Sequence, residues 1–529
     1  MGSQSQLRAA AARQVHVRVR VRLDPEPISA RDCIFLALLT AAGILVSGYH
    51  YGVEDQAIWL AGVKKFLDPS LFPYDSQFFL AQTQFSIFSA LVGTLVQWTG
   101  LSVKTMALVL HLLSVFLFLL GCLKLSRKCF HRRNARWGAV ALVAMLLSLP
   151  VAGTALLLIG QYLHPRVLAT VALIFGLNAV IERRLAAMGW AALAIALHPT
   201  LGLFGAVHLG VLAWPSFEWR WEFRPWKSVV PVSMLLPIVY SDAWREAMDG
   251  RRYVFLNRWT WYEMLGAFAP PLILLWLARS GRKINPPLFP HVARRMAITA
   301  ILGMAAAIMI GSVPALQPLL AVETLRTLQL VYVMMFLLLG GTLAQYVLRR
   351  RPLRWLALFV PLSIALFLSQ RAEFPSTGHF EWPWRSEGNA WLASFEWIRL
   401  NTPKHAYFAL DPRYMESRGQ DNHGFRVLAE RGMMADDMKD RAVAGIDPSL
   451  SREWRAQVLD RKDWAHFTTN DFRRLRRNYQ VDWVLLAQPH RPALSCPFRQ
   501  SDIWVCRTPE GNETRIAGIS SQSRQAVSF

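Results

Sequence analysis

The chain has 529 residues, of which 53% are hydrophobic, and it carries a formal net charge of +23. Its apolar residues gather in long runs, and soluble proteins of this length rarely have so apolar a composition. Much of the positive charge falls in short stretches between these runs, which indicates membrane topology and argues against a nucleic-acid-binding protein. We therefore expect a polytopic α-helical membrane protein whose partners include the lipid bilayer and no nucleic acid.

A basic arm over residues 1–32 precedes the first apolar run. Its segment "RQVHVRVRVRL" alternates Val and Arg, which is compatible with a short strand, while its charge favours a cytoplasmic arm near anionic lipid. No small-residue cleavage site stands out after the first apolar run, so we do not expect a cleavable signal peptide. The first span, at about 33–50, then carries the chain from the cytoplasm to the external side.

The next region, at about 51–100, begins with acidic residues that are unusual beside a membrane: Glu54 and Asp55, followed by Asp75. Its later apolar part, 85–98, is short for a span and contains several Ser residues. Counting that part as a span would place the basic "KLSRKCFHRRNAR" outside, against the positive-inside rule. We therefore predict one large external loop with helices on the membrane surface, or with a re-entrant piece.

Further apolar runs predict spans that alternate through basic cytoplasmic stretches. The predicted spans lie near 104–124, 137–160, 166–181, two short ones within 187–214 that meet at "HPT", 228–240, 264–279, 296–313, 321–346 and 354–370. With the first span, these make a membrane domain over 33–370 with about eleven helices. An odd number of spans places the C-terminal region on the external face.

From residue 371 the composition changes to charges of both signs without a spanning run. Strand-like "HAYFAL", "VDWVLLA" and "DIWVCRT" alternate with polar stretches of helical character such as "SREWRAQVLDRKDWAHF". We expect residues 371–529 to form an extracytoplasmic soluble domain of the α/β or α+β class. Cys496 and Cys506 flank a hairpin-like segment of this domain, and an oxidising compartment would allow a disulfide between them.

Polar groups in or beside spans are costly, so each needs an explanation. On the predicted topology, a set of them collects on the external face: Glu54, Asp55, Asp75, Gln161, His164, Arg166, His198, Glu323 and Arg326. A carboxylate can take a proton from an attacking hydroxyl group. Arg and His can hold a phosphate leaving group through charge-assisted hydrogen bonds. This set is therefore typical of an acid–base and phosphate site.

Each of these residues also has a structural explanation that requires no ligand. The structural roles are an interfacial anchor for Arg166, a helix cap for His198, mutual neutralisation within a helix for Glu323 and Arg326, a turn or cap for Asp68 and Asp75, and a favourable helix start for Glu54 and Asp55. The two explanations differ in one geometric requirement. A shared site requires Asp55 to lie near Arg166 or Arg326.

The order of these features resembles the GT-C superfamily of membrane glycosyltransferases, whose members have a short cytoplasmic N-terminus, one span and a large external loop with surface helices. In that family an acidic residue or pair near the start of the loop acts as a base or metal ligand. "GVEDQAIW" matches this placement, which carries the role to Asp55 and Glu54. The nearest resemblance is to a bacterial branch with an "EDQ...LDPSLFPxDSxFF" loop, a mid-chain "HP" and a C-terminal "FR...ER" segment. Here these are residues 54–79, His198-Pro199 and "GFRVLAERGMM".

The resemblance implies inverting transfer of a sugar from a polyprenyl-phosphate-linked donor to an extracytoplasmic acceptor at the bacterial cytoplasmic (inner) membrane. Glu54 or Asp55 would deprotonate the acceptor, and Asp75 would support or orient that base. His164, Arg166 and Arg326 would hold the lipid phosphate, with Glu323 and His198 in the same donor site. No cofactor is assigned, and a divalent metal stays open. The alternatives are a lipid-linked-glycan ligase, polymerase or flippase, or a non-catalytic membrane protein of envelope assembly.

Overall fold

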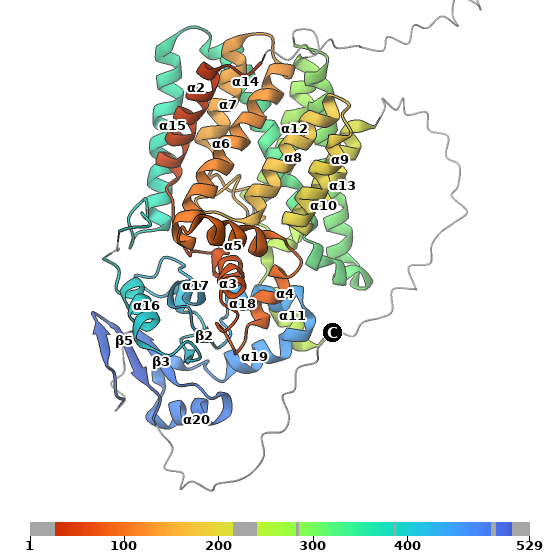
Figure 1. The fold of residues 1–529 in the computed structure, drawn as a ribbon. Helices are drawn as coiled ribbons and strands as arrows, with labels where there is room; N and C mark the ends of the chain where they lie inside the picture. Colours follow the sequence, from red (N-terminus) through yellow and green to blue (C-terminus); the bar gives the residue numbers. More distant parts are fainter. Residues whose placement is uncertain (1–26, 215–240, 282–284, 386–387, 488–493, 510–529) are drawn as a thin grey trace, which may run out of the picture.

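The computed structural model describes residues 27–214, 241–281, 285–385, 388–487 and 494–509, and most of these residues are helical. They form a helical bundle with a smaller C-terminal domain at one end (Figure 1). Most of the predicted basic arm, the predicted span at 228–240 and the end of the chain from residue 510 lie outside the described residues. We call the end of the bundle that faces the C-terminal domain the domain end.

The bundle contains helices at nearly all the predicted spans. They are α2 (Ala30–Ser47), α6 (Val103–Cys129), α7 (Arg133–Met145), α8 (Pro165–Ile181), α9 (Ala186–Leu197), α10 (Pro199–Ala213), α12 (Trp261–Ser280), α13 (Leu288–Ser312), α14 (Leu328–Leu343) and α15 (Pro352–Glu373). Among the described residues, six stretches are long and apolar enough to cross a membrane: α2, α6, α12, α13, α15 and the stretch Thr324–Leu348 that contains α14. This agrees with a membrane protein.

The helices occupy different depths in the bundle. In the apolar window of Thr324–Leu348, 78% of the residues are buried, whereas none is buried in the window of α15. The stretch that contains α14 therefore lies at the centre, where it packs against α7, α12 and α13, and α15 lies at the edge against α2. Apolar side chains on the outer helices, such as Leu353 and Trp276, remain exposed, as expected for surface that faces lipid.

The predicted span at 137–160 is wrong in its second half. Helix α7 ends at Met145, and the chain then runs without helix to His164, with a bridge between Pro150 and Leu157. Pro150 cannot donate a backbone hydrogen bond, and Gly160 has a positive φ of 99°, so this sequence does not sustain a helix. Its backbone groups bond within the segment instead, for example Val151 N to Leu156 O at 2.8 Å.

The first loop contains three helices. They are α3 (Gln56–Leu67), α4 (Gln77–Thr83) and α5 (Phe88–Thr99). Helices α4 and α5 are bent by 95° relative to each other, and α5 lies across the domain end of the bundle (Figure 1). The turn between them contacts the end of α9, where Ile87 N donates to Ala196 O at 3.0 Å. Helices α9 and α10 meet at His198, as predicted from "HPT".

The C-terminal domain contains a five-stranded sheet in the order β2-β1-β3-β5-β4, with parallel pairs among β1, β2 and β3 and antiparallel pairs among β3, β4 and β5. The strands are β1 (Tyr407–Ala409), β2 (Gly432–Met433), β3 (Trp483–Ala487), β4 (Phe498–Gln500) and β5 (Ile503–Arg507), and the helices are α16 (Ala390–Asn401), α17 (Phe425–Ala429), α18 (Lys439–Ile446), α19 (Ser451–Leu459) and α20 (Thr469–Tyr479). The sheet combines βαβ-type parallel pairing with an antiparallel edge.

Alternate strand residues face opposite sides of this sheet. Trp483 and Leu485 pack in one apolar cluster with residues of α16, whereas Val484 and Leu486 pack in another with residues of α20. Helices therefore cover both faces of the sheet. The predicted disulfide between Cys496 and Cys506 is present, next to the β4–β5 hairpin.

The C-terminal domain shares its core with the first loop. Ala57 of α3 lies in the apolar cluster around β1, and Val443 and Trp454 of the domain lie in the cluster of the first loop. Short connecting elements complete this end: α11 (Asp242–Asp249), η2 (Arg252–Val254), η3 (Leu256–Arg258), η5 (Pro314–Val322) and η6 (Thr324–Thr327). The predicted soluble domain is therefore held to the bundle by a common core as well as by the chain.

Candidate functional site

A cavity of about 890 Å³ lies at the domain end of the bundle, between the bundle, the first loop and the C-terminal domain. Its lining includes the starts of α3, α8, α10 and α18 and the last turns of α15. It also includes the junction of η5 and η6 and the non-helical residues 146–164, which we call the irregular segment after α7. These segments are far apart in the sequence. The cavity therefore exists only in the folded chain.

Asp55 lies at the centre of the charged part of this cavity. Its Oδ2 is 3.3 Å from Nη2 of Arg166 and 3.6 Å from Nε2 of His164, and its Oδ1 accepts from Nζ of Lys439 at 3.1 Å. One third of the Asp55 side chain stays exposed. The geometric requirement for a shared site is met, because Asp55 contacts Arg166 directly.

Glu54 shares Lys439 with Asp55, since Nζ of Lys439 donates to Oε2 of Glu54 at 2.5 Å. The backbone of Glu54 has a φ of 51°, which non-glycine residues rarely adopt. Its N–H donates to Asn422 O at 2.9 Å, and Gly424 N donates to Gly52 O at 2.7 Å. Pairing with the C-terminal domain thus holds Glu54 in a strained conformation, which is a frequent property of functional sites.

His164 and His198 occupy equivalent positions, each as the N-cap of a helix that begins with proline. Nδ1 of His164 accepts from Arg166 N at 3.0 Å, so a neutral ring carries its proton on Nε2, which faces Asp55. The two rings lie 5.8 Å apart, and each also contacts the Trp59 ring. The N-termini of α3, α8 and α10 therefore converge on the cavity, where their dipoles favour an anion.

Glu323 and Arg326 form the other charged wall. Glu323 bonds to both Arg326 and Arg251, and Tyr253 OH lies 3.3 Å from its Oε1. The two residues were expected on one helix, but Glu323 has a φ of 54° and separates η5 from η6. The predicted ion pair is present, and it leaves Nη1 of Arg326 3.3 Å from Nε2 of His198. Arg326 thus joins the same cavity.

The charges around Asp55 determine its ionisation. Burial favours the neutral acid, but Lys439 and Arg166 outweigh this effect and hold the pKa of Asp55 well below its usual range. Burial opposes the charge of Lys439, whereas Asp55 and Glu54 raise its pKa well above the usual value. Burial and the neighbouring Arg166 lower the pKa of His164. The resting site thus contains an ionised, ion-paired Asp55 beside a neutral His164.

Asp75 lies outside the lining of this cavity. Its Oδ2 accepts from Tyr407 OH, and from Gln457 Nε2 at 2.9 Å, both in the C-terminal domain. The structure thus places Asp75 at the contact between the first loop and that domain, which corrects the expectation that it orients the base. Asp68 takes the predicted turn position, where its Oδ1 accepts from Ser70 N at 3.0 Å.

Lys439 and Arg251 belong to the site but were not among the predicted residues. Lys439 begins α18, and Arg251, which follows α11, is 2% exposed. A basic residue in a soluble domain carries no positional signal, because such residues are usually solvated. Arg251 lies between the predicted spans at 228–240 and 264–279, on the predicted external face, and its position among acids there was the available signal.

The "FR...ER" segment positions Lys439. Both Nη atoms of Arg426 donate to the Asp440 carboxylate at 2.8 Å, and Asp436 Oδ1 accepts from Lys439 N at 2.6 Å. Glu430 bonds to Lys64 of α3. The acidic loop and the segment that resembles the family motif are therefore in direct contact, and the motif residues fix α3 and α18 relative to each other.

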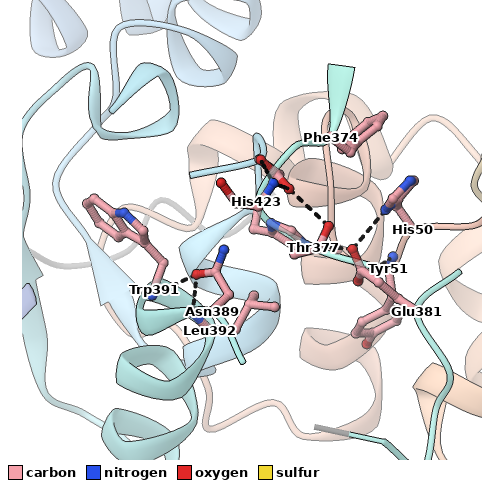
Figure 2. Close-up of polar contacts among 12 residues, drawn as sticks. His50, Tyr51, Phe374, Thr377, Glu381, Asn389, Trp391, Leu392 and His423 are labelled. Atoms are coloured by element: carbon pink, nitrogen blue, oxygen red, sulfur yellow. Dashed lines mark hydrogen bonds and ion pairs between the residues drawn. The ribbon is translucent and has the colours of Figure 1, made fainter. Parts of the chain in front are cut away.

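A buried pair of imidazoles lies at the junction behind the cavity. Oε1 of Glu381 is 2.9 Å from Nδ1 of His50 and 3.1 Å from Nε2 of His423 (Figure 2). The His50 ring stacks on Phe374, with 3.9 Å between centroids. This cluster connects the end of α2, the segment after α15 and the C-terminal domain.

The described residues contain no group of three or more His, Cys, Asp or Glu side chains that could hold a metal ion. Glu54 and Asp55 are the carboxylates that the family resemblance would assign to a metal. Both already bind the Lys439 ammonium. The arrangement does not fit a metal site, and we derive no step through one.

Comparison of this sequence with protein-family models and with curated proteins finds no match. The geometry of the cavity is therefore the basis for a functional proposal, and the resemblance to the GT-C superfamily remains a prediction.

Proposed function

We propose that this chain is a membrane glycosyltransferase of the GT-C type. It would move a sugar from a polyprenyl-phosphate-linked donor to an extracytoplasmic acceptor. The observation that carries the proposal is the contact of Asp55 with Arg166, His164 and Lys439 inside a cavity at one end of an apolar bundle. A base and an anion site lie within one hydrogen-bond length of each other there, as acid–base chemistry on a phosphorylated lipid requires.

The proposed reaction is a single displacement. The acceptor hydroxyl group gives its proton to Asp55, and its oxygen forms a bond to the anomeric carbon of the sugar. The bond between that carbon and the phosphate oxygen breaks, and its electron pair goes to the phosphate. Arg166, Arg326 and the N-termini of α8 and α10 hold the departing phosphate through charge-assisted hydrogen bonds.

The strong pairing of Asp55 fits this sequence of events. An ion-paired carboxylate with a depressed pKa accepts protons poorly. When the donor phosphate binds Arg166, its negative charge offsets the field of the guanidinium at Asp55 and raises the pKa of that carboxyl group. Donor binding would therefore activate the base, which would limit its reactivity in the absence of donor.

The proposed topology has about eleven spans, with the N-terminus in the cytoplasm of a bacterium and the cavity outside the cytoplasmic membrane. Helices α7, α8, α9 and α10 are too short to count with the six long spans, but they lie in the bundle beside them. The basic connections after α6, α8 and α14 lie at the end opposite the C-terminal domain (Figure 1). Their charge supports this orientation.

The position of the charged residues favours a transferase over a flippase. A flippase needs polar groups along a path through the bilayer, whereas Asp55, Arg166 and Arg326 gather at the domain end. A non-catalytic scaffold would not require a strained acidic residue, Glu54, to face an open cavity.

The test is transfer of radiolabelled sugar from polyprenyl phosphate by membranes that contain Asp55→Asn. We expect a loss of at least about 100-fold in rate, because removal of a general base costs about this much. Asp68→Asn is the matched control, since Asp68 lies in the same loop at a surface turn and pairs with Lys404. Transfer by Asp55→Asn at the wild-type rate would remove the catalytic role.

A further inference from the structure

A second cavity, of about 370 Å³, lies between the end of α12, the start of α13 and the end of α14, at the end of the bundle opposite the C-terminal domain (Figure 1). Its lining includes Trp276, Leu277, Phe289, Leu343, Tyr346 and Val347, and it shares no residue with the lining of the cavity at the domain end. Leu277 and Phe289 are buried, whereas Trp276, Tyr346 and Val347 are exposed. The second cavity therefore has an apolar interior and a mouth on the surface that faces lipid.

One wall of the second cavity is a turn of π-helix, η7 (Ala344–Leu348), which directly follows α14. Arg349 N donates to Ala344 O at 2.9 Å, a bond that spans five residues instead of four. Tyr346 and Val347 belong to this turn and line the cavity. Arg349 ends the turn with a φ of 50°, which non-glycine residues rarely adopt. Wide turns and strained backbone are both frequent at functional sites.

Two arginine side chains are fixed at the mouth of the second cavity. Nε of Arg349 donates to Tyr346 O at 2.9 Å, and Nη1 of Arg354 donates to Val347 O at 2.6 Å. Both arginines are exposed, and no Asp or Glu within the described parts of the chain pairs with either guanidinium group. The remaining N–H groups are therefore free to bind an anion.

The positive charge at this end of the bundle is not neutralised by nearby acids. Residues 264–322 and 324–372 contain no Asp or Glu. Among the described acids of the other segments at this end, Asp32 pairs with Arg127, and Glu182 pairs with Lys128. Further exposed arginines flank the second cavity in the sequence: Arg279, Arg350 and Arg351. An anionic partner would therefore be attracted to the mouth.

The geometry points to the second cavity as a binding site for an anionic phospholipid of the leaflet at this end of the bundle. One acyl chain occupies the cavity, and the lipid phosphate accepts charge-assisted hydrogen bonds from Arg349 and Arg354. An apolar cavity that faces hydrocarbon loses dispersion contacts if it stays empty, and an acyl chain can restore them. Basic pockets between membrane helices bind anionic lipid headgroups in this way. The bound lipid joins the ends of α12, α13 and α14, and the site does not depend on the proposed transfer reaction.

The experiment measures binding of three probes to the full-length protein in detergent by native mass spectrometry. The probes are dioleoyl phosphatidylglycerol, dioleoyl phosphatidylcholine with the same chains and no net charge, and glycerol phosphate without chains. We expect phosphatidylglycerol to bind at least about tenfold more tightly than phosphatidylcholine, because each arginine near an anionic headgroup strengthens binding about fivefold. Glycerol phosphate should not be retained, because it has no chain for the cavity.

The arginines are tested by Arg349→Gln combined with Arg354→Gln. This variant should bind phosphatidylglycerol at least about tenfold more weakly and phosphatidylcholine within about twofold of wild type. Arg349→Lys combined with Arg354→Lys preserves the charge and should keep most of the preference. Arg183→Gln combined with Arg184→Gln is the matched control, since it removes two exposed charges at the same end, outside the lining of the second cavity.

The cavity is tested by Val347→Trp, which places a large ring in the mouth. It should weaken both phospholipids about tenfold, because neither chain can enter. Leu353→Trp is the matched control, because Leu353 is 77% exposed on α15 and lies outside the lining. If Val347→Trp fails to fold, as judged by thermal unfolding, Val347→Phe should show the same effect with a smaller ring.

Four outcomes would each overturn the inference. Equal binding of the two phospholipids, or a preference that survives loss of both arginines, would exclude recognition of the headgroup charge. Glycerol phosphate that binds as tightly as phosphatidylglycerol would indicate a site for free phosphate. Unchanged lipid binding by Val347→Trp would place the lipid on the outer surface. Failure of the wild type to retain any lipid would leave the second cavity to a different occupant, such as a second copy of this chain.

Discussion

Asp55 receives its partners from two regions of the chain, and this combination determines how it can act. Arg166 and His164 come from the start of α8, whereas Lys439 comes from the C-terminal domain. The bundle alone would leave Asp55 with one cation and one imidazole. The C-terminal domain supplies a second cation, so its position relative to the bundle controls the charge balance at the proposed base.

Lys439→Met should change the pH dependence of transfer. Burial raises the pKa of Asp55 and Lys439 is the strongest influence that lowers it, so removal of the ammonium raises that pKa. Because the proposed reaction needs ionised Asp55, the acidic limb of the pH–rate profile of kcat/KM should move to higher pH. Lys404→Met is the control, since Lys404 pairs with Asp68 at the surface. An unchanged acidic limb in Lys439→Met would contradict this role.

At the scale of elements, the irregular segment after α7 is the main departure from a regular bundle. Non-helical backbone at membrane depth persists only where protein or a cavity satisfies its polar groups. Here Leu158 N donates to Leu149 O at 2.9 Å, and Gln329 of α14 donates from Nε2 to Leu158 O at 3.0 Å. The segment thus depends on a buried side chain of the central helix.

Gln329→Leu should destabilise the protein without touching the cavity. The substitution leaves Leu158 O without its side-chain donor in an apolar environment, which costs about 1–3 kcal/mol. Thermal unfolding in detergent should show a lower Tm for Gln329→Leu, and the exposed control Gln84→Leu should match wild type. A wild-type Tm for Gln329→Leu would mean that the carbonyl has another partner.

The Glu381 cluster joins elements from three parts of the chain (Figure 2). Burial opposes the charge of Glu381, but His423 and His50 outweigh this effect and hold its pKa well below the usual range. A depressed pKa stabilises the fold at pH values above the unfolded pKa of about 4.3 and ceases to do so as the pH falls through the folded pKa. The cluster is therefore a source of stability at neutral pH.

Glu381→Gln should lower the free energy of unfolding by about 2 kcal/mol at pH 7, because it removes the charged acceptor of two buried hydrogen bonds. The difference in Tm between Glu381→Gln and wild type should shrink as the pH is lowered below about 4, where the wild-type carboxylate begins to lose its advantage. Glu396→Gln, at an exposed pair with Arg399, should show no such difference. A difference in Tm between Glu381→Gln and wild type that stays constant with pH would show that ionisation of Glu381 does not contribute to stability.

At the scale of the whole molecule, the bundle and the C-terminal domain act as one unit around the cavity. The domain contributes Lys439 to the site and shares an apolar core with the first loop. Removal of residues after 373 would therefore expose apolar surface of α3 and α4 as well as remove a site residue.

The disulfide provides a test of the side of the membrane on which the C-terminal domain lies. Disulfides persist in oxidising compartments such as the bacterial periplasm and are rare in the cytosol. We expect Cys496 and Cys506 to resist alkylation by a thiol reagent in solubilised membranes until a reductant is added, as judged by mass spectrometry of the peptides. Exposed Cys33 is the control and should react without reductant. Direct alkylation of Cys496 and Cys506 would place the domain on the reducing side.

Several features could be predicted from the sequence because they depend on local composition. Long apolar runs specify helices in any apolar surroundings, so α12 begins and ends near its predicted positions, α6 extends beyond its predicted end, and α13 starts before its predicted start. The two "HP" pairs fixed helix starts, because proline favours the first turn and the preceding His can cap it. The positive-inside pattern then grouped Asp55, Arg166 and Arg326 on one face, and the structure brings these residues to one cavity.

The tertiary structure alone decided which of these residues meet and what completes the site. Hydropathy could not find the end of α7 at Met145, because apolar residues continue through the irregular segment and only distant partners such as Gln329 make that backbone stable. Asp75 and Asp55 are both acidic residues of the same loop, yet only Asp55 reaches the cavity. Lys439 meets Asp55 from 384 residues away. Contacts over such separations depend on packing of the whole chain, which local periodicity and charge do not encode.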